Sequence, residues 1–523
     1  MATSTTSSLS ETLSERFLVI VAAVLACALA YLGPKIISII RLAALPVIGT
    51  ELGNEEKRRQ AYLQGARKLY YAAYDNFKNG LFKGAARLTT SRNANVIVVS
   101  PKFLPELNKL PDSVVSMEAA VDDAMETKYT KIESHVPIIP HTVTGKLTPS
   151  LTRLNPTIAR ETAEALELEM PLREFTNWQE VNIHEKLLRI VGMVSGRIFI
   201  GPELCRSEEY LDAAINYTMD VMKAQRAVQR MRPWMRPFLA NTLPEIKHLN
   251  QRLNEAQAFL KPLVDRRQKL HAEKPDSEDG PDDFLQWMLD SQDKFTDPAS
   301  RNFAKVQLGL SFAAIHTTTL TATNAFYNLA AASEAVKNEL KEEAVQALSE
   351  NDGVFTSKCL QSMKKLDSFL RETLRMTPAS MASFQRKLLQ DVRLSNGQVV
   401  PKGATIEIPA VAVNNDPEIF PNPEEFDPFR FSRIREEGKA GAAALNQFVS
   451  VNQTSLTFGF GRHACPGRFF AANEIKMILA NTLIRYDVRM PGDNAARWPN
   501  LEFAHMVSLN NSSTASKLSS SLD

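Results

Sequence analysis

One cysteine in this chain is surrounded by residues that could make its sulfur a metal ligand. Cys465 lies in the stretch Phe458-Gly-Phe-Gly-Arg-His-Ala-Cys465-Pro-Gly467. Gly461 and Gly467 allow tight turns or close approaches that a Cβ would forbid. Pro466 fixes φ where a helix begins, and a helix N-terminus stabilises a thiolate. Such a thiolate suits axial ligation of haem iron, where it favours O–O cleavage; the alternative is a buried structural cysteine.

The whole stretch, F-G-x-G-R-H-x-C-P-G, resembles the haem-binding loop of the cytochrome P450 superfamily. The resemblance implies that Cys465 ligates the iron of haem b. It also implies that the loop is shaped by Phe458, Gly461 and Gly467. The family usually has an Arg two residues before the cysteine, bonded to a haem propionate. This chain has His463 there and Arg462 beside it, so one of these two is expected to bind the propionate.

A second candidate site lies on a helix predicted to run from Asp297 to beyond Ala331, about 34 residues or ~50 Å. Its segment Ala313-Ala-Ile-His-Thr-Thr318 resembles the place where P450s carry an acid and an alcohol that deliver protons during oxygen activation. Thr317 would be the catalytic alcohol, and His316 stands in place of the acid. Imidazole titrates near about pH 6.5, so His316 could relay protons. Alternatively its ring points away, satisfied by a carbonyl or water, while Thr317 and ordered water suffice.

A third motif is the tetrapeptide Glu372-Thr-Leu-Arg375, which alone indicates only an i,i+3 ion pair. Downstream, Phe426-Asp-Pro-Phe-Arg430-Phe431 resembles the P-x-R-F motif of P450s. The resemblance implies that Glu372, Arg375 and Arg430 form one buried charge cluster. The role of such a cluster is structural, because it locks the segment that leads to the cysteine loop.

The elements that position these residues are expected to be mainly helical. The spacing of apolar residues predicts a helix over 55–78 and helices through most of 155–270. Asn95–Ser100 is predicted to be a strand, and the turn residues within 392–408 predict a hairpin. The predicted fold class is therefore mainly α: the P450 fold with a small β-rich region, preceded by a transmembrane helix.

Two segments lie where P450s carry parts of the haem pocket. Residues 118–131 lack a clear period and correspond to a flexible loop over the distal side of the haem. Residues 141–151 correspond to a helix with Trp-x-x-x-Arg, whose Arg reaches a propionate, and neither residue is in register here. His141 or Lys146 could substitute for that Arg, or both could belong to a solvated face.

Length alone favours two domains, because 523 residues exceed the usual size of one domain, but the resemblance implies a single catalytic domain. The resemblance places it at 41–510, after an N-terminal tail (1–16) and a membrane segment (17–40), and before a disordered tail (511–523). With 44% hydrophobic residues and a formal charge of +2, neither nucleic-acid binding nor disorder is indicated. The four cysteines are scattered, which argues for a reducing compartment.

Phe17–Leu32 is an unbroken apolar run, about 24 Å long as a helix, slightly short of a bilayer core unless the helix continues. A signal peptide cleaved near Ala28-Leu-Ala30 is the alternative, but the preceding residues are not basic. Lys35, Arg41 and Lys57-Arg-Arg59 follow the run. The positive-inside rule therefore predicts a single-pass anchor in the endoplasmic reticulum membrane, with the catalytic domain in the cytosol.

Two further features bear on this membrane arrangement. Pro34 and Pro46 are expected to break the chain, so that the globular domain turns away from the membrane. Residues 226–238 interleave arginines with Met, Trp and Phe side chains. This pattern suggests either an interfacial segment that rests on lipid headgroups or a plain surface helix that ends at Pro233.

The resemblance implies insertion of one atom of O₂ into an unactivated C–H bond. Electrons would come from NADPH through NADPH-cytochrome P450 reductase, because the chain has no flavin or nicotinamide motif of its own. A basic face around Arg462, Arg468 and Lys476 would suit an acidic reductase. A lipophilic substrate is suggested by the Ala-rich distal helix and by apolar candidates at Met117, Val121, Phe312, Ala379, Met381 and Met506.

The chain looks most like fungal secondary-metabolite P450s, including ent-kaurene oxidase-like members. A terpenoid or meroterpenoid is the leading substrate class, and an indole alkaloid or polyketide is next. Two rival functions stay open at this point. One is a haem-thiolate enzyme that carries out rearrangement or dehydration without a reductase, and the other is a membrane-anchored helical interaction protein without a cofactor.

Overall fold

Helices dominate the structure, which confirms the predicted fold class. The computed structural model describes residues 5–90, 96–172, 177–273, 281–438, 441–492, 496–509 and 515–520. The longer helices are α1 Thr5–Ala43, α2 Glu55–Gln64, α3 Arg67–Lys78, α5 Met117–Met125, α8 Thr148–Glu169, α9 Ile183–Phe199, α10 Glu208–Arg230, α12 Pro244–Glu273, α13 Phe284–Ser291, α15 Phe303–Ala330, α16 Glu334–Ser349, α18 Lys364–Met376 and α22 Arg468–Arg485. The short ones are α4 Leu104–Leu107, α6 Thr127–Thr130, α7 Ile138–Thr142, α11 Arg236–Leu239, α14 Pro298–Arg301, α17 Ser357–Ser362, α19 Ala410–Asn414, α20 Arg430–Glu436 and α21 Ala442–Leu445.

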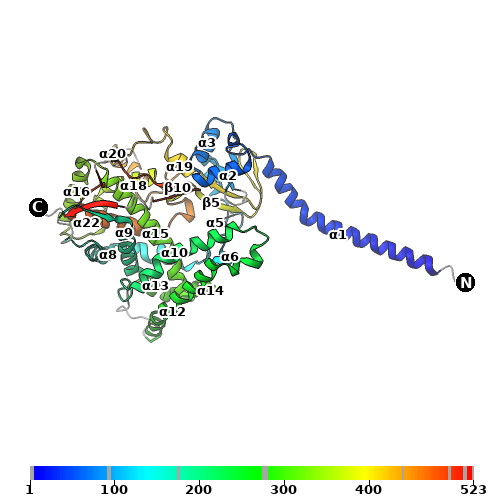
Figure 1. Cartoon of the computed structure of the whole chain (residues 1–523), viewed down its shortest axis with the longest axis horizontal. Helices are drawn as coiled ribbons and strands as arrows, with labels where there is room; N and C mark the ends of the chain where they lie inside the picture. Colours follow the sequence, from blue (N-terminus) through cyan, green and yellow to red (C-terminus); the bar gives the residue numbers. More distant parts are fainter. Residues whose placement is uncertain are drawn as a thin grey trace.

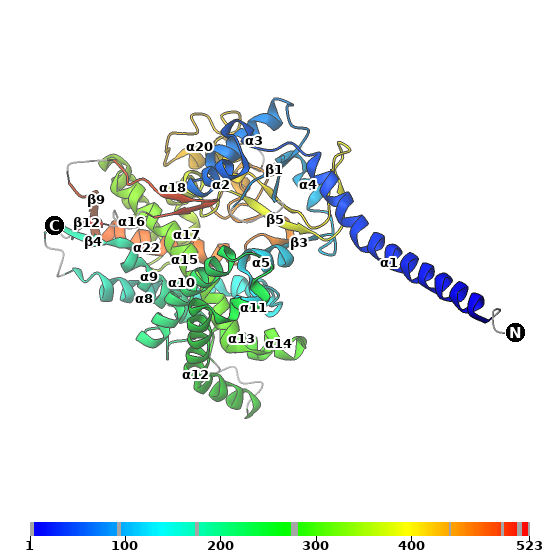
Figure 2. The same ribbon diagram turned by 45° about the vertical axis from the view of Figure 1, so that its right-hand side comes forward.

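The helical body is organised around α15, which lies in its middle (Figures 1 and 2). Most residues of α15 are buried, as expected for a helix whose faces are nearly all apolar. The helices α9, α10, α12, α18 and α22 pack against it. One large hydrophobic core therefore joins the middle of the chain to the helix that follows Cys465.

A five-stranded sheet lies beside the helical body, near α2 and α3 (Figure 1). Its order is β1 Ala85–Leu88, β2 Val96–Val99, β8 Thr405–Ile408, β5 Ser383–Leu388 and β3 Val115–Ser116, with β2 and β8 parallel and the other pairs antiparallel. All four residues of β2 are buried, which explains its continuous apolar sequence. The strand predicted at 95–100 is thus confirmed for Val96–Val99, while Asn95 lies outside the described residues.

Three smaller sheets complete the fold. The predicted hairpin is confirmed by β6 Val392–Arg393 and β7 Val399–Val400, and β10 Leu501–Phe503 pairs with β11 Met506–Ser508. The strand β12 Ala515–Ser520 pairs with both β4 Gln179–Asn182 and β9 Tyr486–Arg489. The prediction of a disordered tail is therefore wrong for 515–520, whose backbone bonds complete a sheet, and 511–514 and 521–523 lie outside the described residues.

Two predicted helices are interrupted. The helix expected over 55–78 is divided into α2 and α3 by Gly65, whose φ of 135° is in the region that favours glycine. The helix expected from Asp297 is divided by Asn302 into α14 and the 28-residue α15. The Asn302 side chain accepts a hydrogen bond from the Lys305 N–H over 3.1 Å. It therefore caps α15 instead of continuing the preceding turn.

The flexible loop predicted at 118–131 is instead the helices α5 and α6. Ser116 caps α5 by accepting a hydrogen bond from the Ala119 N–H over 3.0 Å. The amides of Gln225 and Gln229 in α10 both donate to the Ala124 carbonyl, at 2.8 and 3.0 Å. This segment is ordered because α10 satisfies the carbonyl at its C-terminal end, a contact that no local pattern reveals.

The N-terminal helix projects from the body as a single rod (Figures 1 and 2). Within the described residues, Val19–Ala43 is the one helix long and apolar enough to cross a membrane, and its 25 residues correspond to about 37 Å. The break predicted at Pro34 is wrong, because α1 continues to Ala43, and prolines are tolerated in membrane helices. Pro46 does lie beyond the end of the helix.

Candidate functional site

The loop before Cys465 is closed by its own backbone. The Cys465 N–H donates to the Phe458 carbonyl over 2.7 Å. Gly459 and Gly461 have φ of 80° and 68°, in the left-handed region that favours glycine. A Cβ at Gly461 would lie 1.8 Å from the side-chain oxygen of Asn108. The structure therefore supports the role predicted for Gly461, and it adds Gly459, which the first glycine of the F-G-x-G pattern could have signalled.

Gly467 shows no such requirement within the chain. It precedes the first residue of α22, its φ is −81°, and a Cβ there would meet no other atom within 4 Å. The predicted start of a helix directly after Cys465 is confirmed. The reason expected for a glycine at this position is not visible among the described contacts.

Cys465 is an exposed residue, although protein atoms surround its thiol closely enough to affect its pKa. Burial raises the pKa of its thiol, and this effect exceeds the opposing influence of the Gly467 and Arg468 backbone N–H groups and of the Arg468 charge. The Arg468 side chain also donates to the Cys465 carbonyl over 2.7 Å. The two N–H groups and the Arg468 charge would stabilise the thiolate that forms when a metal cation replaces the thiol proton.

The middle of α15 has one open face. Ala313 and Thr317 are exposed, one turn apart, whereas Ile315, Thr318 and Thr319 are buried. These two residues therefore share one exposed face of α15. Thr317 donates its hydroxyl proton to the Ala313 carbonyl over 2.7 Å. Small side chains and one hydroxyl thus line this face.

His316 is turned toward a neighbouring helix. Its Nε2 lies 2.7 Å from the Ile215 carbonyl of α10, so this nitrogen carries the proton. Burial lowers the pKa of His316, with a smaller opposing influence from the Ile215 carbonyl. This contact matches the alternative in which a carbonyl satisfies the ring, and Thr317 is then the residue that presents a polar atom on the open face.

Arg462 and His463, predicted to bind a propionate, are both held by Asp112. Arg462 donates to Asp112 over 2.8 Å, and Nε2 of His463 lies 2.9 Å from the same oxygen. Burial raises the pKa of Asp112, but the hydrogen bonds from the two side chains outweigh it and lower the pKa overall. In the described structure both side chains therefore contact Asp112, and the expectation that one of them binds a propionate stays a prediction.

A nearby arginine has no such anion. Arg386 points inward from β5, and no carboxylate in the described part of the chain lies within ion-pair distance. Burial lowers its pKa to about 10, and the charge of Arg462 adds to this effect. A buried cation without an anion is costly. Arg386 is a candidate anion-binding residue that the sequence reasoning missed, although a charged residue at a buried position of an alternating strand was a signal.

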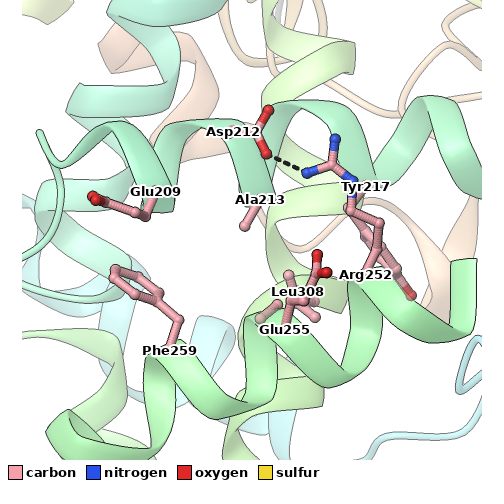
Figure 3. A pocket seen from close by; sticks show the side chains of 9 residues that line it. Glu209, Asp212, Ala213, Tyr217, Arg252, Glu255, Phe259 and Leu308 are labelled. Carbon is pink, nitrogen blue, oxygen red and sulfur yellow. Dashed lines mark hydrogen bonds and ion pairs between the residues drawn. The ribbon is translucent and has the colours of Figure 1, made fainter. Parts of the chain in front are cut away.

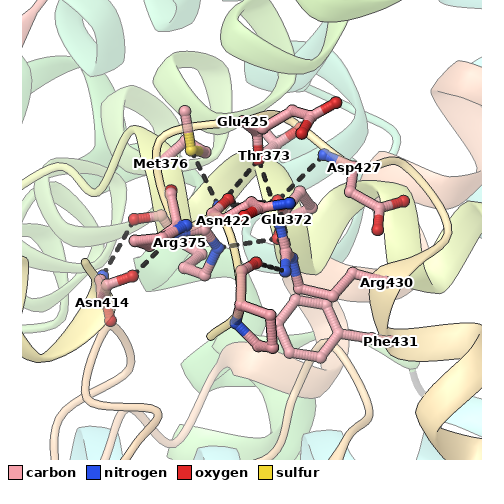
Figure 4. Close-up of polar contacts among 12 residues, drawn as sticks. Glu372, Thr373, Arg375, Met376, Asn414, Asn422, Glu425, Asp427, Arg430 and Phe431 are labelled. Atoms are coloured by element: carbon pink, nitrogen blue, oxygen red, sulfur yellow. Dashed lines mark hydrogen bonds and ion pairs between the residues drawn. The ribbon is translucent and has the colours of Figure 1, made fainter. Parts of the chain in front are cut away.

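The predicted charge cluster is present and buried (Figure 4). Arg375 forms two hydrogen bonds with the Glu372 carboxylate, at 2.7 and 2.8 Å, and Arg430 donates to it over 3.1 Å. The Asp427 N–H donates to the same carboxylate over 3.1 Å. Arg375 also donates to the Pro423 carbonyl over 2.7 Å. Glu372 therefore fixes α18 to the irregular segment before α20.

Residues 127–515 match the protein family described as Cytochrome P450. The chain belongs to the cytochrome P450 family. Cytochrome P450 monooxygenase ATR3 of Stachybotrys chlorohalonatus is 43% identical over 415 residues, which cover 79% of this chain and 86% of the relative. Cytochrome P450 monooxygenase olcJ of Penicillium canescens is 34% identical over 469 residues, covering 88% and 86%. The chain is thus a P450 monooxygenase, and the haem cofactor with a cysteine thiolate as axial ligand follows from its family.

The residues of this P450 fit a haem. Cys465 is an exposed residue at a helix N-terminus, and α15 offers an open face of small residues. Ala314 of α15 and Phe458 and Phe469 beside the cysteine all pack at the edge of the same core. Arg386 supplies a cation that lacks a carboxylate, which suits a propionate.

Several other residues that were predicted to form the site or the reductase surface have different surroundings in the structure. Lys476 is buried and bonded to Asp367 over 2.6 Å, so it does not belong to a basic surface for a reductase. Met381 is in the core beneath the sheet, and the ring of His141 packs against Phe295. Lys146 is exposed and stays a candidate propionate ligand. These corrections arise from packing between distant segments, which the sequence alone does not show.

A separate cavity of about 250 Å³ lies between α10, α12 and α15 (Figure 3). Tyr217 and Leu308 form part of its apolar wall, and Arg252 is paired with Asp212. Leu308 and Thr317 are nine residues apart, so they lie on opposite sides of α15. The cavity is therefore distinct from the open face that carries Thr317.

Proposed function

We propose that this P450 oxidises a lipophilic secondary metabolite of the terpenoid or meroterpenoid class in a fungus. Its similarity to P450 monooxygenases of Stachybotrys chlorohalonatus and Penicillium canescens supports a fungal enzyme. The exposed face of α15 supports an apolar substrate, because its exposed residues Ala313 and Thr317 are uncharged. The observation that carries the proposal is an exposed cysteine at a helix N-terminus in a protein with this open helix face.

Each residue of the site has a proposed part. When bound, haem supplies oxygen activation, with one oxygen atom inserted into a C–H bond and the other released as water. Cys465 holds the iron, Arg386 binds a propionate, and Phe458 and Gly461 maintain the loop. Thr317, whose hydroxyl already donates to a carbonyl, passes protons on the open face. His316 holds α10 through the Ile215 carbonyl.

Electrons are proposed to come from NADPH through NADPH-cytochrome P450 reductase. The enzyme should be expressed with that reductase and incubated with terpenoid, indole alkaloid and polyketide substrates under NADPH. NADPH-dependent oxidation of a terpenoid or meroterpenoid is expected. Turnover without NADPH would favour rearrangement or dehydration chemistry, and the absence of a carbon-monoxide difference spectrum in the reduced protein would refute a haem enzyme altogether.

We also propose that α1 anchors the enzyme in the endoplasmic reticulum membrane with the catalytic domain in the cytosol. The unburied, apolar stretch Val19–Ala43 supports an anchor. A second contact is proposed at the segment between α10 and α12. There Trp234 and Phe238 are 67% and 77% exposed beside Arg232. Large exposed aromatic side chains next to arginine suit a lipid headgroup region.

A further inference from the structure

A buried carboxylate outside the Glu372 cluster connects three distant segments. Asp367 lies in α18, five residues before Glu372, and is almost completely buried. One of its oxygens lies 2.6 Å from Nζ of Lys476 in α22. The other accepts hydrogen bonds from Arg435 in α20 and from the Phe448 backbone N–H, both over 2.9 Å. Both oxygens of this carboxylate therefore have partners, which come from two cations and one backbone amide.

One of these contacts acts on the chain that leads into the cysteine loop. Phe448 is buried, and its ring packs edge-to-face against Phe458 with centroids 5.5 Å apart. The Phe458 carbonyl accepts the hydrogen bond from the Cys465 N–H. The path from Asp367 to Cys465 thus consists of a hydrogen bond, an aromatic contact and a second hydrogen bond.

Another contact acts on the chain that leads out of the loop. Lys476 is buried in α22, where it also donates to the Leu360 carbonyl over 3.2 Å. The first residues of the same helix supply the backbone N–H groups of Gly467 and Arg468 that act on the Cys465 sulfur. Because a helix moves as a rigid unit, the Lys476 contact fixes where those N–H groups point.

We propose that Asp367 is a positioning residue for the Cys465 ligand, because its carboxylate holds both the segment that enters the cysteine loop and the helix that leaves it. This role differs from that of Glu372, which holds α18 to the segment before α20. Within the described part of the chain, Glu372 makes no hydrogen bond to the cysteine loop or to α22. Removing the Asp367 charge releases Lys476 and Arg435 together, so the buried Lys476 and the half-buried Arg435 both lose this anion.

The test compares purified Asp367→Asn and Lys476→Gln holoenzymes with the wild type. The carbon-monoxide complex of each reduced protein is recorded, and the fraction with the thiolate-type Soret band is measured per bound haem. We expect this fraction to fall at least about twofold in both variants, because charged hydrogen bonds that position the cysteine loop are lost. Hydrogen exchange should become faster at Phe448 and in the first turns of α22.

The control is Asp265→Asn, which removes the same charge from an exposed ion pair with Lys261 and should leave both measurements unchanged. A merely structural role for Asp367 gives a different result. In that case yield and haem content fall, but the haem that stays bound shows the wild-type fraction of thiolate-type complex. That outcome in Lys476→Gln, which keeps the Phe448 and Arg435 contacts, or in Asp367→Asn, would overturn the proposal.

Discussion

Cys465 is an exposed residue whose thiol has protein atoms on several sides, and this burial raises the pKa of the thiol. The backbone N–H groups of Gly467 and Arg468 approach the sulfur and oppose that effect. Cys465→Ser keeps the size of the side chain but replaces a thiolate ligand with a hydroxyl that stays protonated at neutral pH. We expect the variant to lose the thiolate-type Soret shift of its reduced carbon-monoxide complex. An unchanged spectrum would mean that another residue holds the iron.

Thr317 and His316 are adjacent in sequence but point in different directions. Thr317→Ala should retain haem and substrate binding, yet product formed per NADPH consumed should fall about tenfold or more as electrons are diverted to peroxide. Thr317→Ser restores a hydroxyl and is the matched control. Full coupling in Thr317→Ala would mean that the motif has been misassigned.

His316→Ala should behave differently from Thr317→Ala. The Ile215 carbonyl loses its donor, so stability should fall by about 1–3 kcal/mol. Product per NADPH should stay at the wild-type value, because the ring faces α10. If product formed per NADPH consumed falls as far as it does in Thr317→Ala, His316 takes part in proton delivery.

A second half-buried histidine, His184 of α9, makes stability depend on pH. Nδ1 of His184 lies 3.3 Å from the Thr323 hydroxyl, and burial, with a smaller influence of His316, lowers the pKa of His184 to about 4. In the unfolded chain this pKa is about 6.5. The unfolded state therefore binds a proton first, so the stabilisation is complete above about pH 6.5 and is lost as the pH falls toward 4.

Urea unfolding of wild type and His184→Gln at pH 7 and pH 4.5 measures this contribution. The wild type should lose on the order of 2 kcal/mol more than the variant over this interval. Equal losses in the two proteins would show that the imidazole titrates alike in the folded and unfolded states.

Predicting individual residues from sequence succeeded where the chemistry is local. The cysteine loop closes through hydrogen bonds between residues seven or fewer positions apart, so its pattern carries its geometry. The propionate assignment depended on contacts across the chain. Asp112, more than 300 residues away, holds Arg462 and His463, while Arg386 lies without a carboxylate on a strand.

At the scale of elements, the Glu372 cluster fixes α18 to the segment before α20. Glu372→Ala leaves Arg375 and Arg430 buried without their anion, at a cost of about 3–5 kcal/mol. We expect low yield and loss of haem incorporation, measured by haem absorbance per protein. Glu339→Ala, which breaks an exposed pair with Lys365, should cost at most about 1 kcal/mol. A Glu372→Ala protein with normal haem content and only a slower rate would contradict the structural role.

Helices and strands with a strong local period were predictable, and their ends often were not. The continuous apolar sequence of β2 predicts a strand, because every residue of that strand is buried. The interruption at Asn302 depends on one side chain that caps the next helix. The helical structure of 117–131 depends on contacts with α10. The strand β12 pairs with β9 and also with β4, which lies far away in the sequence.

At the scale of the whole molecule, membrane association is proposed to have two parts. Deleting residues 1–33 should weaken association with microsomal membranes but leave a salt-sensitive fraction bound through the segment around Trp234 and Phe238. Adding Trp234→Ala and Phe238→Ala to the deletion should release that fraction, as measured by flotation. Full release of the simple deletion at low salt would refute the second contact.

Glycosylation tests on which side of the membrane the catalytic domain lies. The sequon at Asn216 lies in α10 and should stay unmodified if the domain is cytosolic. Glycosylation of Asn216, detected as a mobility shift that an endoglycosidase reverses, would place the domain in the lumen.

The unbroken passage of α1 from the proposed anchor to the body has a mechanical consequence. Arg41 pairs with Asp391, and Ser38 donates to the Lys402 carbonyl over 3.3 Å, so the end of α1 is fastened to the domain. Within the described residues, no loop separates the apolar stretch of α1 from the part of the helix that contacts the domain. One residue inserted into this helix would rotate everything beyond it by about 100°. If α1 spans the bilayer as proposed, the number of residues in α1 sets which face of the domain lies next to the lipid. Two inserted residues would then turn Trp234 away from the membrane.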